Sequence, residues 1–110
     1  MKNLLAIGSL FIAANAVAES ECPTLFFNLP LYPQANYCQQ FNDAPPATLT
    51  YHANAGMQQT AEYYQKQLGK PGSDSMFKGR RVMQFDQGNT IIVLSVDGNG
   101  TQVDILVKTA

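Results

Sequence analysis

The sequence predicts an α+β domain, in which one helix packs on one face of a single antiparallel sheet of about four to five strands. Two observations predict this class. One stretch has apolar residues at helical spacing, and several others alternate between apolar and polar residues as half-buried strands do. The expected order is strand, strand, helix and then three strands (β-β-α-β-β-β), which fits an antiparallel sheet better than alternating parallel units.

The first elements come from residues 19–46, an arm rich in proline and aromatic residues. Pro30 and Pro33 exclude a helix between them, because proline lacks the N–H that a helix needs and clashes with the preceding turn. We expect this arm to be extended, with a strand over residues 35–41 and a turn over residues 42–46.

One strand and the helix come next. Residues 47–53 alternate between apolar and polar side chains, which predicts a half-buried strand. Asn54 is placed to cap the helix and Gly69 to end it, with Pro71 just beyond. Between them, one apolar stripe recurs at helical spacing and is formed by Met57, Ala61, Tyr64 and Leu68.

The C-terminal part is predicted to consist of a loop at residues 72–75 and three strands, at residues 80–85, 90–96 and 102–108. The sequence Asp-Gly-Asn-Gly at residues 97–100 predicts a tight hairpin between the last two strands. A helix followed by such a hairpin is consistent with a helix lying across an antiparallel sheet.

Apolar residues occur on both faces of this last hairpin. Ile91, Val93 and Leu106 lie on one face, opposite Ile92 and Ile105. One helix cannot cover both faces of a sheet, so the second face must be covered by the aromatic arm or by a partner. We favour the arm, held in place by a disulfide.

Residues 1–18 are predicted to be a secretory signal peptide, with Lys2, an apolar stretch and the small residues Ala16-Val17-Ala18 before the cleavage site. The apolar stretch is too short to be a good membrane span, and no later stretch is long enough. The remaining chain is predicted to be one small domain, with residues 19–46 as the arm and residues 47–110 as the α+β core. We expect it to be exported, to the periplasm or to the extracellular medium.

The chain has two cysteines, Cys22 and Cys38. An even number of cysteines in a small exported domain predicts a disulfide, which in the chain-entropy model stabilises the fold by about 3 kcal/mol. Two thiols and a single histidine, with no close spacing among them, make a poor zinc site. We therefore expect a Cys22–Cys38 disulfide, no metal and no cofactor.

The charge of the chain is small, since seven Lys or Arg against eight Asp or Glu give a net charge of −1. Such a balance does not predict binding to nucleic acid or to an anionic membrane surface. The one basic concentration includes Lys78, Arg80 and Arg81 and is a candidate contact for an acidic partner. Because neighbouring residues of a strand point to opposite faces, Arg80 and Arg81 are not expected to share one patch.

No catalytic set is recognisable in the sequence. His52 is the one histidine, and no serine lies in a Gly-x-Ser-x-Gly elbow. The acidic residues fall mostly at turns and on predicted surfaces, and no spacing pairs two of them as in a glycosidase. Residues 97–101 begin like a calcium loop, but Lys108 stands where the twelfth-position carboxylate is needed. We expect no catalytic residues.

One motif resembles a known group of proteins. Leu29-Pro30-Leu31-Tyr32-Pro33-Gln34-Ala35 is similar to the LPxYPxA opening of small exported bacterial domains of unknown function. In those domains a strand, a helix with a Tyr-Tyr pair and a late leucine, and a β-meander follow; Tyr63-Tyr64 and Leu68 fit that order. The resemblance implies an α+β fold and the cell envelope, and it brings no activity or site residues.

Taken together, these features predict an exported bacterial protein-binding module without enzymatic activity, such as a periplasmic immunity or inhibitor protein. The alternative is a structural or accessory subunit of an envelope or secretion assembly, and a small enzyme is the least supported. The partner is expected to be another envelope or exported protein, and the oligomeric state stays open. The candidate partner-binding residues are Ile91, Val93 and Leu106, the hairpin residues Gly98 and Asn99, and Lys78, Arg80 and Arg81.

Overall fold

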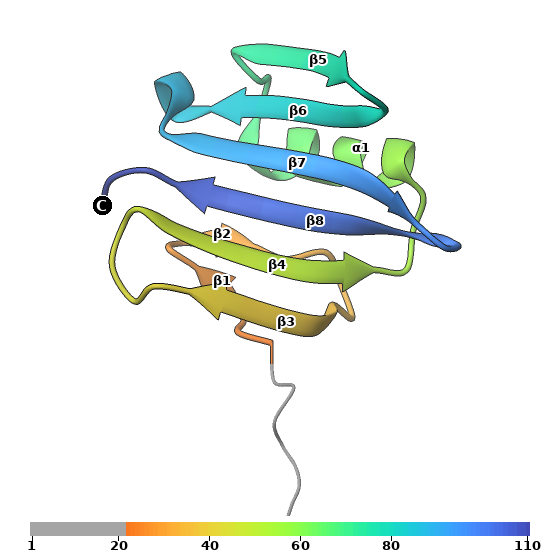
Figure 1. Ribbon diagram of the computed structural model, residues 1–110. Helices are drawn as coiled ribbons and strands as arrows, with labels where there is room; N and C mark the ends of the chain where they lie inside the picture. The colour runs from red at the N-terminus through yellow and green to blue at the C-terminus, as the bar shows by residue number, and fades with distance from the viewer. Residues whose placement is uncertain (1–21) are drawn as a thin grey trace, which may run out of the picture.

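The computed structural model describes residues 22–110, and the predicted signal peptide lies outside these residues. The described chain is mostly β, with eight strands in two antiparallel sheets and one α-helix (Figure 1). The prediction of an α+β fold with a single sheet of four to five strands is therefore wrong. The strands are β1 (Leu25–Phe26), β2 (Leu29–Pro30), β3 (Asn36–Phe41), β4 (Ala47–Ala53), β5 (Ser73–Phe77), β6 (Arg80–Phe85), β7 (Thr90–Asp97) and β8 (Gly100–Val107).

The large sheet has six strands in the order β3-β4-β8-β7-β6-β5, and the small sheet pairs β1 with β2. After β4 the chain passes through helix α1 (Met57–Leu68) to the far edge of the large sheet at β5. A meander through β6 and β7 then returns to the middle, where β8 pairs with β4. The last strand thus lies between the first part of the sheet and the meander.

The core lies on one face of the large sheet. A row of neighbouring side chains crosses four strands on this face, through Leu49, Ile105, Ile92 and Met83, and all four side chains are fully buried. The predicted alternation of residues 47–53 is confirmed, because Ala47, Leu49, Tyr51 and Ala53 are buried and the residues between them are not.

Helix α1 covers part of this face through the predicted stripe. Ala61 and Tyr64 are buried, and Met57 and Leu68 pack against the core. Gly69 ends the helix with a φ of 90°, as predicted. Asn54 is not the N-cap. The helix begins at Met57, and its N-cap is Gly56, two residues after Asn54. No helix among residues 22–110 is both long enough and apolar enough to cross a membrane.

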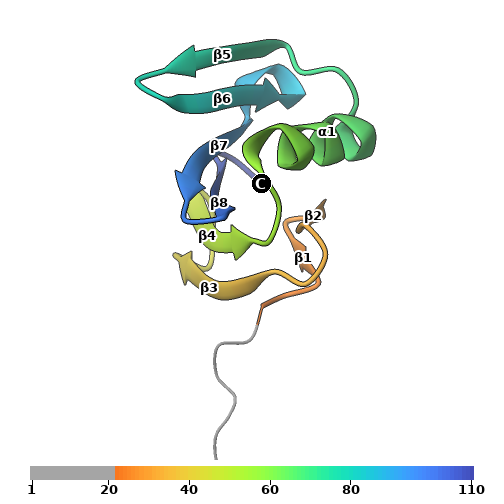
Figure 2. The ribbon, with the colours of Figure 1, turned by 90° about the vertical axis from the view of Figure 1, so that its right-hand side faces the viewer.

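The described part of the N-terminal arm that precedes β3, residues 22–35, packs on the same face as the helix, beside it (Figure 2). Phe26 and Leu31 of the arm are buried in the core. The expectation that the arm covers the second face is therefore wrong. The physical reason is that α1 contacts β7 and β8, so the β4 side of the core face needs a separate cover, which the arm supplies.

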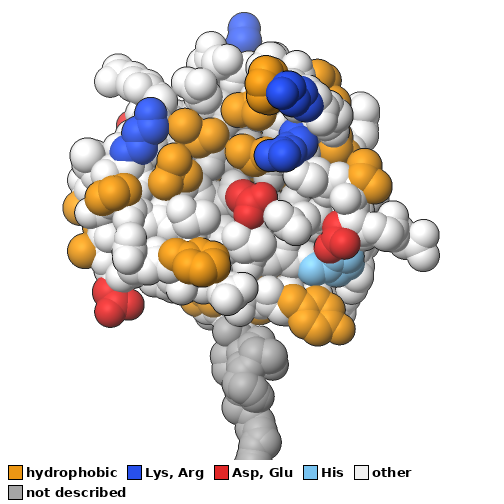
Figure 3. Space-filling model, in the orientation of Figure 1, with side chains coloured by type: hydrophobic (Ala, Val, Ile, Leu, Met, Phe, Trp, Pro, Cys, Tyr) orange, Lys and Arg blue, Asp and Glu red, His pale blue; other side chains and the backbone are white. Residues whose placement is uncertain are grey.

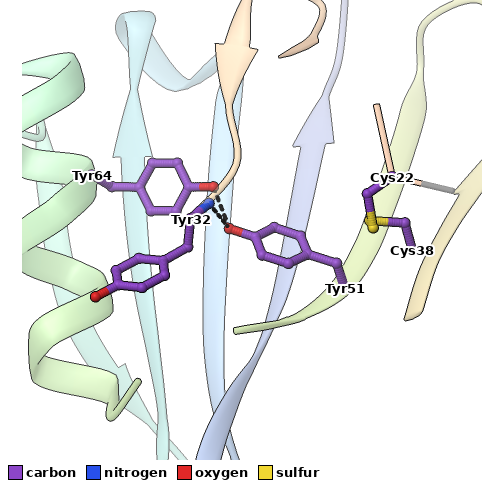
Figure 4. Close-up of a disulfide and its surroundings, with 5 residues drawn as sticks. All are labelled: Cys22, Tyr32, Cys38, Tyr51 and Tyr64. Atoms are coloured by element: carbon purple, nitrogen blue, oxygen red, sulfur yellow. Dashed lines mark hydrogen bonds between the residues drawn. A yellow bond between two sulfur atoms is a disulfide. The ribbon is translucent and has the colours of Figure 1, made fainter. Parts of the chain in front are cut away.

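A buried network of tyrosines holds the arm in this position (Figure 4). The Tyr51 hydroxyl accepts a hydrogen bond from the Tyr32 N–H at 2.8 Å and lies 2.6 Å from the Tyr64 hydroxyl. Tyr64 in turn donates to the carbonyl of Pro30 at 2.8 Å. Because the Tyr64 hydroxyl uses its hydrogen for Pro30, the Tyr51 hydroxyl is the donor in the bond between the two tyrosines. Burial raises the pKa of Tyr51 to about 12 and also raises the pKa of Tyr64.

The predicted disulfide is present and joins the start of the arm to strand β3 (Figure 4). Cys22 and Cys38 are bonded, with their Cα atoms 5.1 Å apart. Their side chains are partly buried against the core. The arm is thus fixed covalently at its beginning and by tyrosine hydrogen bonds further along.

Strand β5 replaces the loop predicted at residues 72–75. It forms a hairpin with β6 through a two-residue turn, in which Lys78 and Gly79 have φ values of 52° and 82°. All five residues of β5 are exposed, so no apolar alternation marks it as a strand. The predicted strands at residues 35–41, 80–85, 90–96 and 102–108 are confirmed with small shifts at their ends.

Candidate binding surface

The face of the large sheet opposite the helix carries no other element of the described chain, and we call it the bare face. In Figure 1 the viewer looks onto it, with α1 behind the strands, and Figure 3 shows its side chains. Ile91, Val93 and Leu106, three of the predicted partner-binding residues, come together at its centre. Ile91 pairs with Leu106 across β7 and β8, and Val93 pairs with Val82 across β6.

These four residues, Val82, Ile91, Val93 and Leu106, form what we call the apolar patch. All four are half-buried by one another and by their neighbours. Larger apolar side chains lie at both edges of the bare face: Phe41 on β3 is 48% exposed and Phe77 on β5 is 62% exposed. Thr48 on β4 separates Phe41 from the apolar patch, and Phe77 pairs with Arg80 at the opposite edge.

Asp104 adds one carboxylate next to the apolar patch, across from Val93. It accepts hydrogen bonds from the Thr50 hydroxyl at 2.6 Å and from the Gln102 side-chain amide at 3.1 Å. These bonds hold both carboxylate oxygens in place. Asp104 thus presents a carboxyl group of fixed orientation between hydroxyl and apolar groups, and each of its oxygens can accept more than one hydrogen bond.

The β7–β8 hairpin forms one end of the bare face. Its turn consists of Gly98 and Asn99, both exposed, and Gly98 has a φ of 62°. Asp97 at the base of this turn bonds His52 on β4, with 2.8 Å between Asp97 Oδ2 and His52 Nδ1. The contact crosses β8, which lies between the two strands, and it braces the hairpin.

Gly100 makes the contact between His52 and Asp97 sterically feasible. A Cβ atom at this position would overlap the carbonyl oxygen of Ala53 and would lie 2.7 Å from the His52 ring. No partner for His52 was predicted from the sequence. The residue pair was missed because Asp97 is 45 positions away and on a strand that does not neighbour β4.

The basic residues do not form one patch, as predicted from strand alternation. Arg81 lies on the helix side and makes two hydrogen bonds to Asp74, at 2.9 and 2.7 Å. These bonds lower the pKa of Asp74 from its ordinary value. Arg80 is exposed on the bare face, and the Lys78 ammonium lies 5.4 Å from the centre of the Phe77 ring. Two basic residues, Lys78 and Arg80, therefore remain available beside β5.

A groove of about 590 Å³ lies at the other end of the sheet, where the β1–β2 turn, the end of α1 and the β6–β7 connection meet. Its floor is apolar, with Leu68, Phe85 and Val107 among the lining residues. Two lining residues, Phe27 and Asp86, have φ values of 49° and 53°, in the left-handed region that side chains disfavour. The groove cannot be predicted from the sequence, because its walls come from these three segments and from the C-terminal residues of the chain.

The residues that could carry chemistry are His52, the two cysteines and the acidic side chains. Among residues 22–110, no three His, Cys, Asp or Glu side chains come together as metal ligands would. Within the same range, the hydrogen bond of the His52 ring is to Asp97, and both cysteines are in the disulfide.

The chain therefore combines a bare face, a braced hairpin and an exposed edge strand in one small domain. Comparison with known proteins adds no relative: no protein-family model matches the chain, and no curated protein or solved structure matches it.

Proposed function

We propose that the chain is an exported bacterial protein-binding module without enzymatic activity, and that it binds another envelope or exported protein through the bare face. The observation that carries this proposal is the one-sided construction of the domain. The helix and the arm both cover one face of the large sheet, while the apolar patch on the other face has no cover from the described chain. Contiguous apolar surface of this kind is typical of interaction sites.

The composition of the bare face supports a protein partner. Aromatic residues are enriched at protein interfaces, and Phe41, Phe77 and Tyr37, which is 76% exposed, lie around the apolar patch and at the sheet edge. Asp104 supplies a central polar contact that fixes the orientation of a partner. Since the face is built on hydrogen-bonded strands, little conformational entropy is lost when a partner binds.

The hairpin favours an immunity or inhibitor protein over a passive subunit. Gly98 and Asn99 project beyond the sheet, and the bond between His52 and Asp97 holds the base of the turn. A braced, exposed tip of this kind suits insertion into the cleft of a partner enzyme. The disulfide supports an oxidising compartment, which agrees with the proposed export to the periplasm or beyond.

The proposal is tested by affinity capture. The bait is the exported protein, produced by expression of the full chain, with the disulfide intact. The matched variants are Val93→Lys on the bare face and Gln67→Lys on the exposed side of α1. We expect one stoichiometric protein partner with the wild type and with Gln67→Lys, and loss of that partner with Val93→Lys. Retention of the partner by a folded Val93→Lys variant would overturn the assignment of the bare face.

A further inference from the structure

We infer that the free edge of β5 binds an acidic, extended segment of the partner, which adds to the large sheet as a further antiparallel strand. The inference rests on the proposed binding function and names the chemistry of the partner segment. Strand addition uses main-chain hydrogen bonds for affinity and the flanking side chains for specificity. Both are present at β5.

The main-chain groups of β5 are available for such a strand. Phe77 and Arg80 close the two-residue turn between β5 and β6, and such a closing pair exchanges both of its hydrogen bonds. Hydrogen bonding alternates along an antiparallel ladder, so the N–H and C=O groups of Asp74 and Met76 point away from β6. These groups form the outer edge of the sheet, and they recur at every second residue, which is the spacing at which an added antiparallel strand forms hydrogen bonds.

The opposite edge of the sheet is less suited to strand addition. Strand β3 changes register between Asn36 and Gln39, and Tyr37 between them has a φ of 57°. Irregularities of this kind twist an edge and block the pairing of another strand. Strand β5, in contrast, pairs with β6 in continuous register from Ser73 to Phe77. The regular edge of the large sheet is therefore the β5 edge.

The charges beside β5 select an acidic partner. Asp74 and Arg81 neutralise each other through their two hydrogen bonds, whereas Lys78 and Arg80 stand exposed at the end of the hairpin. Basic side chains also lie at the β5–β6 end of the face in Figure 3. An incoming strand with basic residues on this side would bring like charges together, which is unfavourable across strands. An incoming strand with acidic residues on the bare-face side is favoured instead.

Apolar contacts are available on both sides of the incoming strand. Met76 is 61% exposed on the helix side, and Phe77 is 62% exposed on the bare-face side. Phe77 thus adds an exposed aromatic ring at this edge of the bare face. A segment that pairs with β5 therefore contacts the surface proposed above and belongs to the same partner.

The first test uses two synthetic heptapeptides, one alternating valine with glutamate and one alternating valine with lysine. Hydrogen exchange of the exported, disulfide-intact protein is followed by NMR at millimolar peptide. We expect the glutamate peptide to slow exchange of the Asp74 and Met76 amides by about tenfold or more, and the lysine peptide to leave them unchanged. Equal effects of the two peptides, protection at β3, or no protection at β5 would overturn the inference.

The second test separates the main chain of β5 from its side chains. Met76→Pro removes an outward N–H, which an edge strand tolerates, and Met76→Thr is the matched control that keeps it. We expect Met76→Pro, but not Met76→Thr, to lose binding of the glutamate peptide. The double variant Lys78→Glu, Arg80→Glu keeps the main chain unchanged and should bind the lysine peptide in place of the glutamate peptide. This variant tests the inference even if Met76→Pro does not fold.

The same variants distinguish this inference from the proposed function. If the natural partner is lost with Val93→Lys but retained by folded Met76→Pro, the bare face is the binding surface and the β5 inference is wrong. If both variants keep the partner, both assignments are wrong. Loss of the partner with Met76→Pro, but not with Met76→Thr, supports strand addition.

Discussion

At the scale of single residues, Gly100 leaves the space that the end of β4 and the His52 ring occupy beside the β7–β8 hairpin. The strand conformation of Gly100 is ordinary, so the requirement is for space and not for an unusual φ. The backbone of Ala53 is the first obstacle to any added side chain. Backbone cannot move aside as a flexible side chain does, so the cost of a substitution falls on the sheet itself.

We predict that Gly100→Ala lowers the free energy of unfolding by about 1–3 kcal/mol, the usual cost of forcing extra volume into a packed site. The matched control is Gly72→Ala, because the nearest contact to a Cβ there is 3.9 Å away. That control should change stability by about 0.5 kcal/mol or less. Urea denaturation of both variants provides the comparison, and equal stabilities would contradict the steric argument.

The buried tyrosines predict a loss of stability in alkali. Because the pKa of Tyr51 rises to about 12 in the folded protein and that of Tyr64 rises as well, the unfolded chain loses these protons first as the pH passes 10. Their stabilising contribution is complete below pH 10 and is lost above it. With two groups, the free energy of unfolding should fall by about 2.7 kcal/mol per pH unit between pH 10 and 12.

Urea denaturation at several pH values between 8 and 12 measures this slope. A variant with both Tyr51→Phe and Tyr64→Phe removes the two titrating groups and provides the control. It should be less stable at neutral pH, since hydrogen bonds to Pro30 and Tyr32 are lost, yet show a flatter dependence on alkali. An unchanged slope in the double variant would assign the alkaline transition to other groups.

Residue-level prediction from the sequence succeeded where alternation alone decides the outcome. Ile91, Val93 and Leu106 were expected on one face and do lie together there. Arg80 and Arg81 were expected on opposite faces and do lie so. The His52–Asp97 contact was missed because it depends on which strand lies between β4 and β7, and periodicity along one strand carries no such information.

At the scale of elements, sequence patterns found the long strands and the helix but missed the short and the exposed ones. Strands β1 and β2 have two residues each, which is too short for a period to be recognised. Strand β5 has no buried face and so lacks the apolar alternation on which strand prediction depends. Strands β1 and β2 form the second sheet that was not predicted, and β5 is the sixth strand of the large sheet.

The disulfide is expected to stabilise the fold mainly by restricting the unfolded chain. We predict that the double variant Cys22→Ser, Cys38→Ser is less stable by about 3 kcal/mol in the chain-entropy model. The arm should stay in place at neutral pH, because the tyrosine hydrogen bonds to Pro30 and Tyr32 do not depend on the sulfur atoms. Denaturant titration gives the first quantity, and hydrogen exchange at the Tyr32 amide tests the second.

At the scale of the whole molecule, adjacent isoleucines on β7 test the one-sided construction. Ile92 is fully buried in the core, whereas Ile91 is half-buried on the bare face. We predict that Ile92→Ala costs about 2–5 kcal/mol of stability. Ile91→Ala should cost about 1 kcal/mol or less and should instead weaken capture of the partner. Equal losses of stability would mean that the bare face belongs to the core of a larger fold.

The sequence could predict that one helix leaves a sheet face uncovered, but not which segment fills the space beside the helix. That choice depends on the width of the sheet. With six strands, the helix covers only the middle of the core face, and the arm is needed beside it. The strand missing from the predicted large sheet, β5, lies at the edge opposite the arm, so the error in strand number and the error in arm position have separate causes.

The place of β8 has a consequence for the order of events during biosynthesis. It is the last strand made, yet it is the one that joins the β3–β4 pair to the β5–β6–β7 meander. A nascent chain therefore has two separate parts with exposed apolar surface until its C-terminal residues emerge. This topology delays completion of the core until β8 can pair with both parts.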